Sequence, residues 1–145
     1  MAHEVIEKKS QAKTAPNAPV GHGVGRRKRA VARVWMRRGS GKMSVNGQDY
    51  TSYFDTTFAA ATAATPFKVC PLGDSYDFHA NVNGGGKMAQ ADAVKLGIAR
   101  AFVDFDEDMK SPLRKSGLLT VDARKKERKK YGQRGARRKF QFVKR

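Results

Sequence analysis

Cysteine and acidic residues are scarce in this sequence, and long apolar runs are absent from it. The single cysteine, Cys70, cannot form a disulfide within the chain, and no cysteine and histidine residues have zinc-ligand spacing. No stretch approaches the roughly 20 apolar residues that a membrane span needs. Residues 1–24 contain neither arginine nor an apolar segment, which is unlike a secretory signal or an arginine-rich transit peptide. These absences predict a protein of a reducing compartment, without a metal site, a cofactor or a membrane partner.

Positive charge is abundant and unevenly distributed. Thirty lysines and arginines against thirteen acidic residues give the 145-residue chain a net charge of +17. Residues 26–42 contain eight basic residues and no acidic one, residues 43–109 contain four basic and nine acidic residues, and residues 124–145 contain twelve basic residues and one acid. A compact surface with this charge repels itself unless a polyanion neutralises it. Two cationic blocks around an acidic middle indicate a folded core with RNA-facing arms.

Hydrophobic alternation predicts the strands of one compact domain. Apolar residues occupy every second position over 30–37 and over 76–83, which indicates two half-buried strands. Turn residues fill 38–41, and the alternation resumes at 43–45 before an Asn-Gly pair. We therefore expect a β-hairpin in which strand 30–37 pairs with 43–45.

Other patterns predict helices. An alanine-rich segment, 58–65, should form a helix that stops at Pro66. Apolar residues recur every three or four positions over 91–105, as in a core helix, and Gly97 within it suggests close approach of another backbone. A Ser-Pro pair should start a short helix over 111–117 that ends at glycine. This order of elements favours an α+β fold of the split βαβ kind.

The chain divides into three parts on this interpretation. Residues 1–24 form a flexible N-terminal extension, residues 25–121 a globular α+β RNA-binding domain, and residues 122–145 an extended basic tail. The tail has too few apolar residues to offset the entropy cost of ordering it alone, so we expect it to be disordered until bound. Fully extended, its last fourteen residues would reach on the order of 45 Å.

The predicted RNA-binding residues are basic side chains of both blocks, with few exceptions. Strand residues Arg33, Trp35 and Arg37 share one face, and cations interleaved with an aromatic ring suit phosphate contact and base stacking. The alternative is a solvated face with Trp35 buried within the domain. The RNA contacts we predict are Arg26, Arg27, Lys28, Arg29, Arg33, Arg37, Arg38, Lys42, Lys87, Arg124, Lys125, Lys126, Arg128, Lys129, Lys130, Tyr131, Arg134, Arg137, Arg138 and Lys139.

Three features could indicate an enzyme, but each has a stronger structural explanation. The glycine run 84–86 before Lys87 suggests a phosphate loop, yet Met88 stands where that motif needs serine or threonine. The acidic cluster 104–108 could hold magnesium, but carboxylates at a helix junction more often act as caps. His79 could act as a catalytic base, but no serine or cysteine around it has the sequence setting of a nucleophile. We therefore predict no catalysis.

Three blocks, residues 25–47, 81–102 and 113–145, resemble the small-subunit ribosomal protein S-nine family in sequence and order. The resemblance implies a domain like the second domain of ribosomal protein S-five. It implies a structural constituent of the small-subunit head that binds small-subunit ribosomal RNA and neighbouring head proteins. The expected location is the ribosome of the bacterial cytoplasm, with an organellar matrix as the alternative.

The resemblance also assigns a role to the end of the tail. It implies that Lys144 and Arg145 contact the anticodon stem-loop of the peptidyl-site tRNA. This sequence departs from the family pattern at Ala89, Asp92, Val121, Ala123 and Phe140. Composition alone leaves a rival open, namely a free nucleic-acid chaperone or chromatin-like protein.

Overall fold

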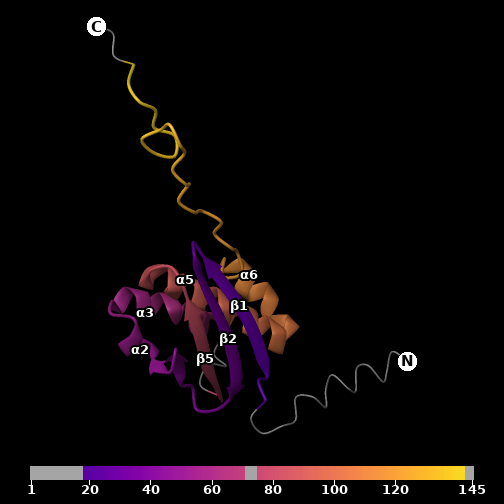
Figure 1. The fold of residues 1–145 in the computed structure, drawn as a ribbon. Coiled ribbons are helices and arrows are strands. Elements are labelled where there is room, and N and C mark those ends of the chain that lie inside the picture. The colour runs from indigo at the N-terminus through magenta and orange to yellow at the C-terminus, as the bar shows by residue number, and fades with distance from the viewer. Residues whose placement is uncertain (1–17, 71–74, 143–145) are drawn as a thin grey trace.

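The computed structural model describes residues 18–70 and 75–142, and it places one mixed sheet beside a group of helices (Figure 1). The strands are β1 (Gly21–Arg27), β2 (Ala30–Arg38), β3 (Met43–Val45), β4 (Gln48–Asp49) and β5 (Tyr76–Asn83), and they lie in the order β1-β2-β5-β3-β4. The helices are α2 (Tyr50–Tyr53), α3 (Thr57–Ala63), α4 (Thr65–Val69), α5 (Lys87–Phe105), the 3-10 turn η2 (Glu107–Met109) and α6 (Lys110–Lys115). This arrangement confirms the expected α+β class.

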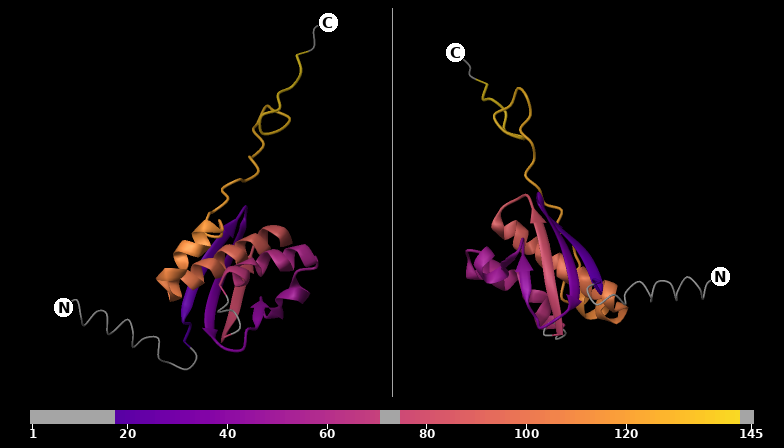
Figure 2. Two further views of the ribbon diagram at one scale, coloured as in Figure 1. Left: turned by 180° about the vertical axis from the view of Figure 1, so that it is seen from behind. Right: turned by 60° about the horizontal axis from the view of Figure 1, so that its bottom comes forward.

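Helix α5 crosses one face of the sheet, and the other helices gather around it on the same side (Figure 2). Its buried face carries Ala93, Val94, Ile98 and Phe102. Opposite them lie the inward residues of β2, which are Ala30, Ala32, Val34 and Met36. The predicted alternation of β2 is thus confirmed, as are strand β5 and the long core helix. The helices cover a single face, and no helix within residues 18–70 and 75–142 lies on the other face of the sheet.

Strand β1 packs against α5 at backbone distance, through glycines on alternate positions. A Cβ atom added to Gly23 or Gly25 would overlap the carbonyl oxygens of Gly97 and Ala93 in the helix. Arg100 reinforces this contact by donating from Nη1 to the Val24 carbonyl at 2.6 Å. Close approach at Gly97 is therefore confirmed. The strand begins at Gly21, so the last residues of the expected flexible segment 1–24 belong to the sheet, while residues 1–17 lie outside the described ranges.

The predicted hairpin between β2 and β3 is wrong, because β5 lies between these two strands. Strand β5 pairs antiparallel with β2 and parallel with β3. The connection after β2 wraps around the start of β5, where the Asp77 carboxylate accepts the backbone N–H groups of Ser40 and Lys42, both at 2.9 Å. The Asn46-Gly47 pair instead turns β3 into β4, with φ angles of 50° and 81°.

The helix boundaries differ slightly from the sequence expectations. The alanine-rich helix is α3, and the chain continues beyond it in α4, whose first turn accommodates Pro66 because its missing N–H needs no partner there. Helix α6 starts at Lys110, with Met109 rather than Ser111 at the N-cap position, and Gly117 with a φ of 70° follows its end. From Thr120 to Phe142 the structure contains neither helix nor strand.

Candidate nucleic-acid interface

The turn between β1 and β2 projects two cations, Lys28 and Arg29, from the end of the sheet. Both side chains are exposed, and Arg26 beside them is exposed as well. Lys28 has a φ of 54°, a left-handed conformation that costs a non-glycine residue about 1 kcal/mol or more. The antiparallel pairing of Arg27 with Ala30 encloses only these two residues, so the turn is tight and its charges stand close together.

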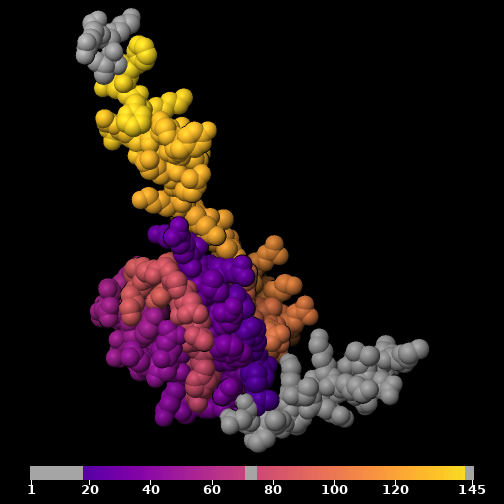
Figure 3. All heavy atoms as spheres, viewed as in Figure 1, coloured from indigo at the N-terminus to yellow at the C-terminus, as the bar shows by residue number. Residues whose placement is uncertain are grey.

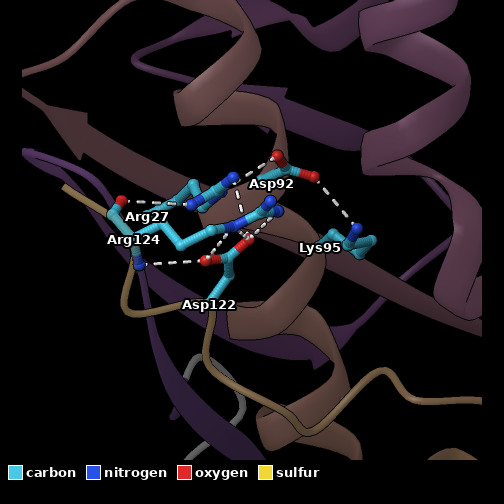
Figure 4. A network of polar contacts seen from close by, with 5 residues as sticks. All are labelled: Arg27, Asp92, Lys95, Asp122 and Arg124. Atoms are coloured by element: carbon cyan, nitrogen blue, oxygen red, sulfur yellow. Dashed lines mark hydrogen bonds and ion pairs between the residues drawn. The ribbon is translucent and has the colours of Figure 1, made fainter. Parts of the chain in front are cut away.

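The tail leaves the body beside this turn, and an ion-pair network attaches it there (Figure 4). Arg27 of β1 contacts the Asp122 carboxylate at 2.9 Å and the Asp92 carboxylate of α5 at 3.6 Å. It also donates from Nη1 to the Arg124 carbonyl at 3.4 Å. Asp92 in turn contacts Lys95 at 2.9 Å. Arg27 therefore joins a strand, the core helix and the start of the tail.

Asp122 is the acidic centre of the network. The Arg124 guanidinium contacts its carboxylate at 2.6 Å, and the Arg124 backbone N–H donates to it at 3.0 Å. These hydrogen bonds and the charges of Arg124 and Arg27 hold the pKa of Asp122 far below its usual range. Asp122 is consequently ionised at every pH near neutrality, and the attachment persists there. We call residues 122–128 the tail root. Figure 3 shows the chain leaving the body past the β1–β2 turn.

Polar side chains line the uncovered face of the sheet in cross-strand rows. One row runs from His22 on β1 through Trp35 on β2 to His79 on β5 and Ser44 on β3. The ring centroids of His22 and Trp35 are 5.4 Å apart, and Ser44 Oγ lies 2.8 Å from His79 Nδ1. The next row pairs Arg33 with Asn81.

Trp35 is half-buried on this face rather than enclosed in the domain. A shallow hollow of about 430 Å³ lies beside it, lined by Trp35 together with His79, Asn81 and Asn83. Amide and imidazole groups around an aromatic ring can hydrogen-bond base edges while the ring stacks. The face therefore fits RNA contact better than the alternative of a tryptophan buried inside the domain.

The remaining predicted contacts of the body lie away from the turn. Arg37, Arg38 and Lys42 lie at the opposite end of β2, which spans roughly 25 Å. Lys87 donates from Nζ to the Tyr53 carbonyl at 2.7 Å and sits 3.6 Å from the centre of the Tyr53 ring. The structure thus separates the predicted body residues into a cluster at the β1–β2 turn, an open sheet face and a distant end.

The described part of the tail is an extended chain with one compact turn. It contains the predicted RNA contacts from Arg124 to Lys139. Glu127 accepts Arg137 at 2.9 Å and lies 3.6 Å from Lys130, which draws the turn together. Tyr131 and Phe142 are 96% and 89% exposed. Exposed rings between cations suit stacking on bases. Lys144 and Arg145 lie outside the described residues, so their predicted contact stays a prediction.

The acidic cluster before α6 has structural tasks. Asp106 caps η2 by accepting the Asp108 N–H at 3.0 Å, and Asp104 accepts the His22 backbone N–H at 3.0 Å. In the described ranges, no three histidine, cysteine or acidic residues are grouped as metal ligands. Within the same ranges no helix has both the length and the apolarity to cross a bilayer.

Sequence reasoning missed two acidic residues that organise the basic interface, Asp92 and Asp122. In the sequence, Asp92 stands out only as a departure from a family pattern, and Asp122 only as the start of the tail. One signal is visible for Asp122, an isolated acid directly before an almost wholly cationic segment. Its partner Arg27 is among the predicted RNA-binding residues, but three of its contacts are within the protein.

Comparisons with known proteins identify the family to which the sequence is similar. A family model described as "Ribosomal protein S9/S16" matches residues 25–145. The Small ribosomal subunit protein uS9 of Cytophaga hutchinsonii is 49% identical over 122 residues, covering 84% of this chain and 95% of that protein. The protein of that name from Thermus thermophilus is 49% identical over 124 residues, covering 86% and 97%. The one from Borrelia turicatae is 44% identical over 126 residues, covering 87% and 93%.

The match extends over the sheet from Gly25 onward, the core helix and the whole tail, and the relatives align along almost their full length. The turn cations, the tail root and the tail itself therefore all lie inside the matched region. On this basis the chain belongs to the ribosomal protein S9/S16 family.

Proposed function

We propose that this protein is a structural constituent of the small ribosomal subunit and binds small-subunit ribosomal RNA. The observation that carries the proposal is the family match over residues 25–145, which includes both cationic blocks and the tail. The body offers RNA the β1–β2 turn and the uncovered sheet face, and the tail adds an extended row of cations. Neighbouring ribosomal proteins meet the acidic middle of the chain.

The role is structural rather than catalytic. The residues that first suggested chemistry are engaged in the fold: Asp106 caps a turn, Lys87 holds Tyr53, and the glycines before α5 form a strand-to-helix turn with φ angles of 73° and 68°. RNA binding by many cations gains its free energy from counterion release and needs no reacting group.

A competition experiment separates this function from that of a free nucleic-acid chaperone. Full-length protein is bound to in-vitro-transcribed small-subunit ribosomal RNA at 0.15 M salt, and either duplex DNA or the same RNA is added as competitor. We expect the RNA to compete at least about a hundredfold more effectively than the DNA, since specific sites typically exceed non-specific ones by 10³ or more. Equal competition would favour the chaperone or chromatin-like rival.

The finer part of the proposal concerns the end of the tail. Lys144 and Arg145 add charge-assisted hydrogen bonds to phosphate oxygens of the tRNA anticodon stem-loop at the peptidyl site. Three features support this role: the family resemblance, the cationic pair at the last two positions, and a tail that extends away from the body (Figure 1).

Subunits assembled with a chain lacking Lys144 and Arg145 test the tail-tip contact. We expect peptidyl-site tRNA to bind roughly tenfold more weakly, because two charge-assisted hydrogen bonds are removed, while subunit assembly is unchanged. The matched control is the double variant Lys144→Arg with Arg145→Lys, which keeps both charges and should keep most of the affinity. Unchanged tRNA binding by the shortened chain would refute the contact.

A further inference from the structure

A cationic cleft lies between the β1–β2 turn and the tail root, and we call it the turn–tail cleft. Its volume is about 630 Å³. Its cations come from two segments far apart in the sequence, Lys28 and Arg29 on the turn and Lys125, Lys126 and Arg128 on the tail root. Neither segment could form this cleft without the other.

The charges of the cleft are available to a ligand. Within residues 18–70 and 75–142, none of the five cations takes part in an ion pair. The one acid at the cleft, Glu127, already contacts Arg137 and Lys130 of its own tail. Five close cations without ion-pair partners repel one another, and an anionic occupant would lower that cost.

The floor of the cleft admits a chain backbone. The uncharged part of its lining is Gly85, Gly86 and Ala89, which bring little side-chain bulk. A Cβ atom added to Gly86 would meet nothing within 4 Å, so the space above that residue is open. A ligand can therefore approach the protein backbone closely between the two rows of cations.

A second hollow adjoins the turn–tail cleft and lengthens the space open to an anion. It measures about 520 Å³ and shares Lys28, Arg29 and Lys125 with the turn–tail cleft. The two hollows therefore adjoin on either side of these shared cations. A continuous anionic strand can follow both, whereas a free nucleotide would fill only one.

Asp122 sets the relative position of the two cationic rows. Through Arg27 it ties the tail root to the strand that leads into the turn, with an Arg27–Asp122 distance of 2.9 Å (Figure 4). Without this carboxylate, the cations of the tail root would no longer be held opposite Lys28 and Arg29. With Asp122 in place, a negatively charged residue therefore assists the capture of an anion.

We propose that the turn–tail cleft binds the sugar-phosphate backbone of one ribosomal RNA strand, gripped jointly by turn and tail, with Asp122 as the positioning residue. The inference rests on the proposed function, because it identifies where on the protein the ribosomal RNA is held. It adds that the two cationic segments act as one site rather than as independent contacts.

A double-mutant cycle on the full-length protein tests joint binding. In-vitro-transcribed small-subunit ribosomal RNA is the ligand, and affinity is measured at several salt concentrations. The turn variant carries Lys28→Gln and Arg29→Gln, and the tail variant carries Lys125→Gln and Lys126→Gln. Each should weaken binding roughly tenfold and lower the log–log salt slope by about 1.4 to 1.8, the range expected when two phosphates of a single strand or a duplex are no longer neutralised.

Joint binding predicts that the combined variant loses clearly less affinity than the product of the two separate losses, because removing one row already releases the strand from the other. The matched control combines the turn variant with Arg138→Gln and Lys139→Gln, tail cations outside the cleft, and there the losses should multiply. Losses that multiply in both combinations would overturn the proposal.

The variant Asp122→Asn gives the second test, because a charge effect and a positioning role predict opposite changes in RNA affinity. If charge alone mattered, removing a carboxylate would tighten RNA binding, as expected for the control Asp55→Asn on an exposed loop of the acidic middle. Positioning predicts that Asp122→Asn weakens binding severalfold and abolishes the coupling between turn and tail. Tighter binding by Asp122→Asn would overturn its positioning role, and thermal unfolding verifies that both variants fold.

These outcomes are separate from failure of the proposed function. If the unchanged protein does not prefer ribosomal RNA to duplex DNA, the proposed function fails. If the preference is present but the cycle shows no coupling, only the turn–tail cleft fails.

Discussion

Asp77 and Asp122 are acidic residues of a basic protein that the fold uses as local anchors. The Asp77 carboxylate receives the N–H groups of Lys42 and Ser40 in the connection between β2 and β3. The Asp122 carboxylate receives the side chain and N–H of Arg124 and pairs with Arg27. Each arrangement stabilises the ionised form and lowers the pKa, chiefly through the backbone hydrogen bond from Lys42 for Asp77 and the Arg124 side chain for Asp122.

The lowered pKa values predict how pH affects these anchors. A group whose native pKa lies below its unfolded value of about 3.9 stabilises the native state above that pH and loses the contribution as pH falls through the native pKa. Carboxyl carbon chemical shifts should therefore give midpoints below about 3.9 for Asp77 and Asp122. The variants Asp77→Asn and Asp122→Asn should show a weaker fall in stability on acidification. Midpoints at or above about 3.9 would contradict the observed contacts.

The individual basic residues were predictable from sequence, but their grouping was not. The charge of Lys28 or Lys125 follows from its identity and surroundings in the chain. Their position on either side of one cleft depends on the contact between Arg27 and Asp122, which lie in segments that no local pattern connects. The contact of Lys87 with the Tyr53 carbonyl could not be read from local sequence either, because the two residues lie 34 positions apart.

Elements with strong periodicity were predictable, and their pairing was the difficult step. Strands β2 and β5 and helix α5 follow from alternation and from three- and four-residue spacing. The hairpin prediction joined β2 to its nearest neighbour in sequence, but Asp77 on the distant strand β5 holds the connection between them. Strand β1 was not predicted, because its glycines have low strand propensity. The glycines are needed for the close packing of β1 against α5 at Gly97, which only the structure shows.

The Asn46 side chain joins β3 to β5 beyond the backbone ladder. Its Oδ1 accepts the Val82 N–H at 2.8 Å, and its Nδ2 donates to the Val82 carbonyl at 3.1 Å. Asn46→Ala removes both bonds and places alanine at a φ of 50°, so it should lower the free energy of unfolding by about 2 to 4 kcal/mol. Asn46→Gly removes the same bonds without the backbone strain and should cost about 1 kcal/mol less. Urea denaturation measures both, and equal stability of Asn46→Ala and the unchanged protein would contradict this role.

The β1–α5 contact can be tested with single methyl groups. A Cβ at Gly25 would overlap the backbone of α5 at Ala93, so Gly25→Ala should destabilise the fold by about 3 kcal/mol or more by separating strand and helix. Gly86→Ala is the matched control, since its Cβ meets nothing within 4 Å, and it should cost about 1 kcal/mol at most. Similar thermal midpoints for the two variants would show that the close approach is not required.

At the scale of the whole molecule, the protein combines a folded body with a long cationic arm, and the two parts need different partners. The body buries its aromatic centre, where Phe78 and Phe102 pack with ring centroids 5.5 Å apart. The described tail holds Tyr131 and Phe142 almost fully exposed. Apolar side chains left in water on an extended arm gain their packing only from a partner, which in our account is RNA.

Removing the tail should therefore affect RNA binding without unfolding the body. A chain ending at Asp122 lacks twelve cations, and the log–log salt slope should fall by roughly 0.9 for every phosphate that is no longer neutralised. We expect much weaker binding to small-subunit ribosomal RNA and poor incorporation into subunits, with the thermal midpoint nearly unchanged. A large fall in thermal stability would show that the tail supports the body instead.

The most direct test of the account is sedimentation of this protein from a cell lysate on a density gradient after a high-salt wash. A basic protein held only by about 6 to 10 phosphate contacts on an RNA surface loses on the order of a thousandfold or more in affinity between roughly 50 and 200 mM salt. A protein enclosed by folded ribosomal RNA along both body and tail can leave only if that RNA opens, so it should survive the wash and sediment with small subunits. Recovery of the full-length protein only at the top of the gradient would contradict the account.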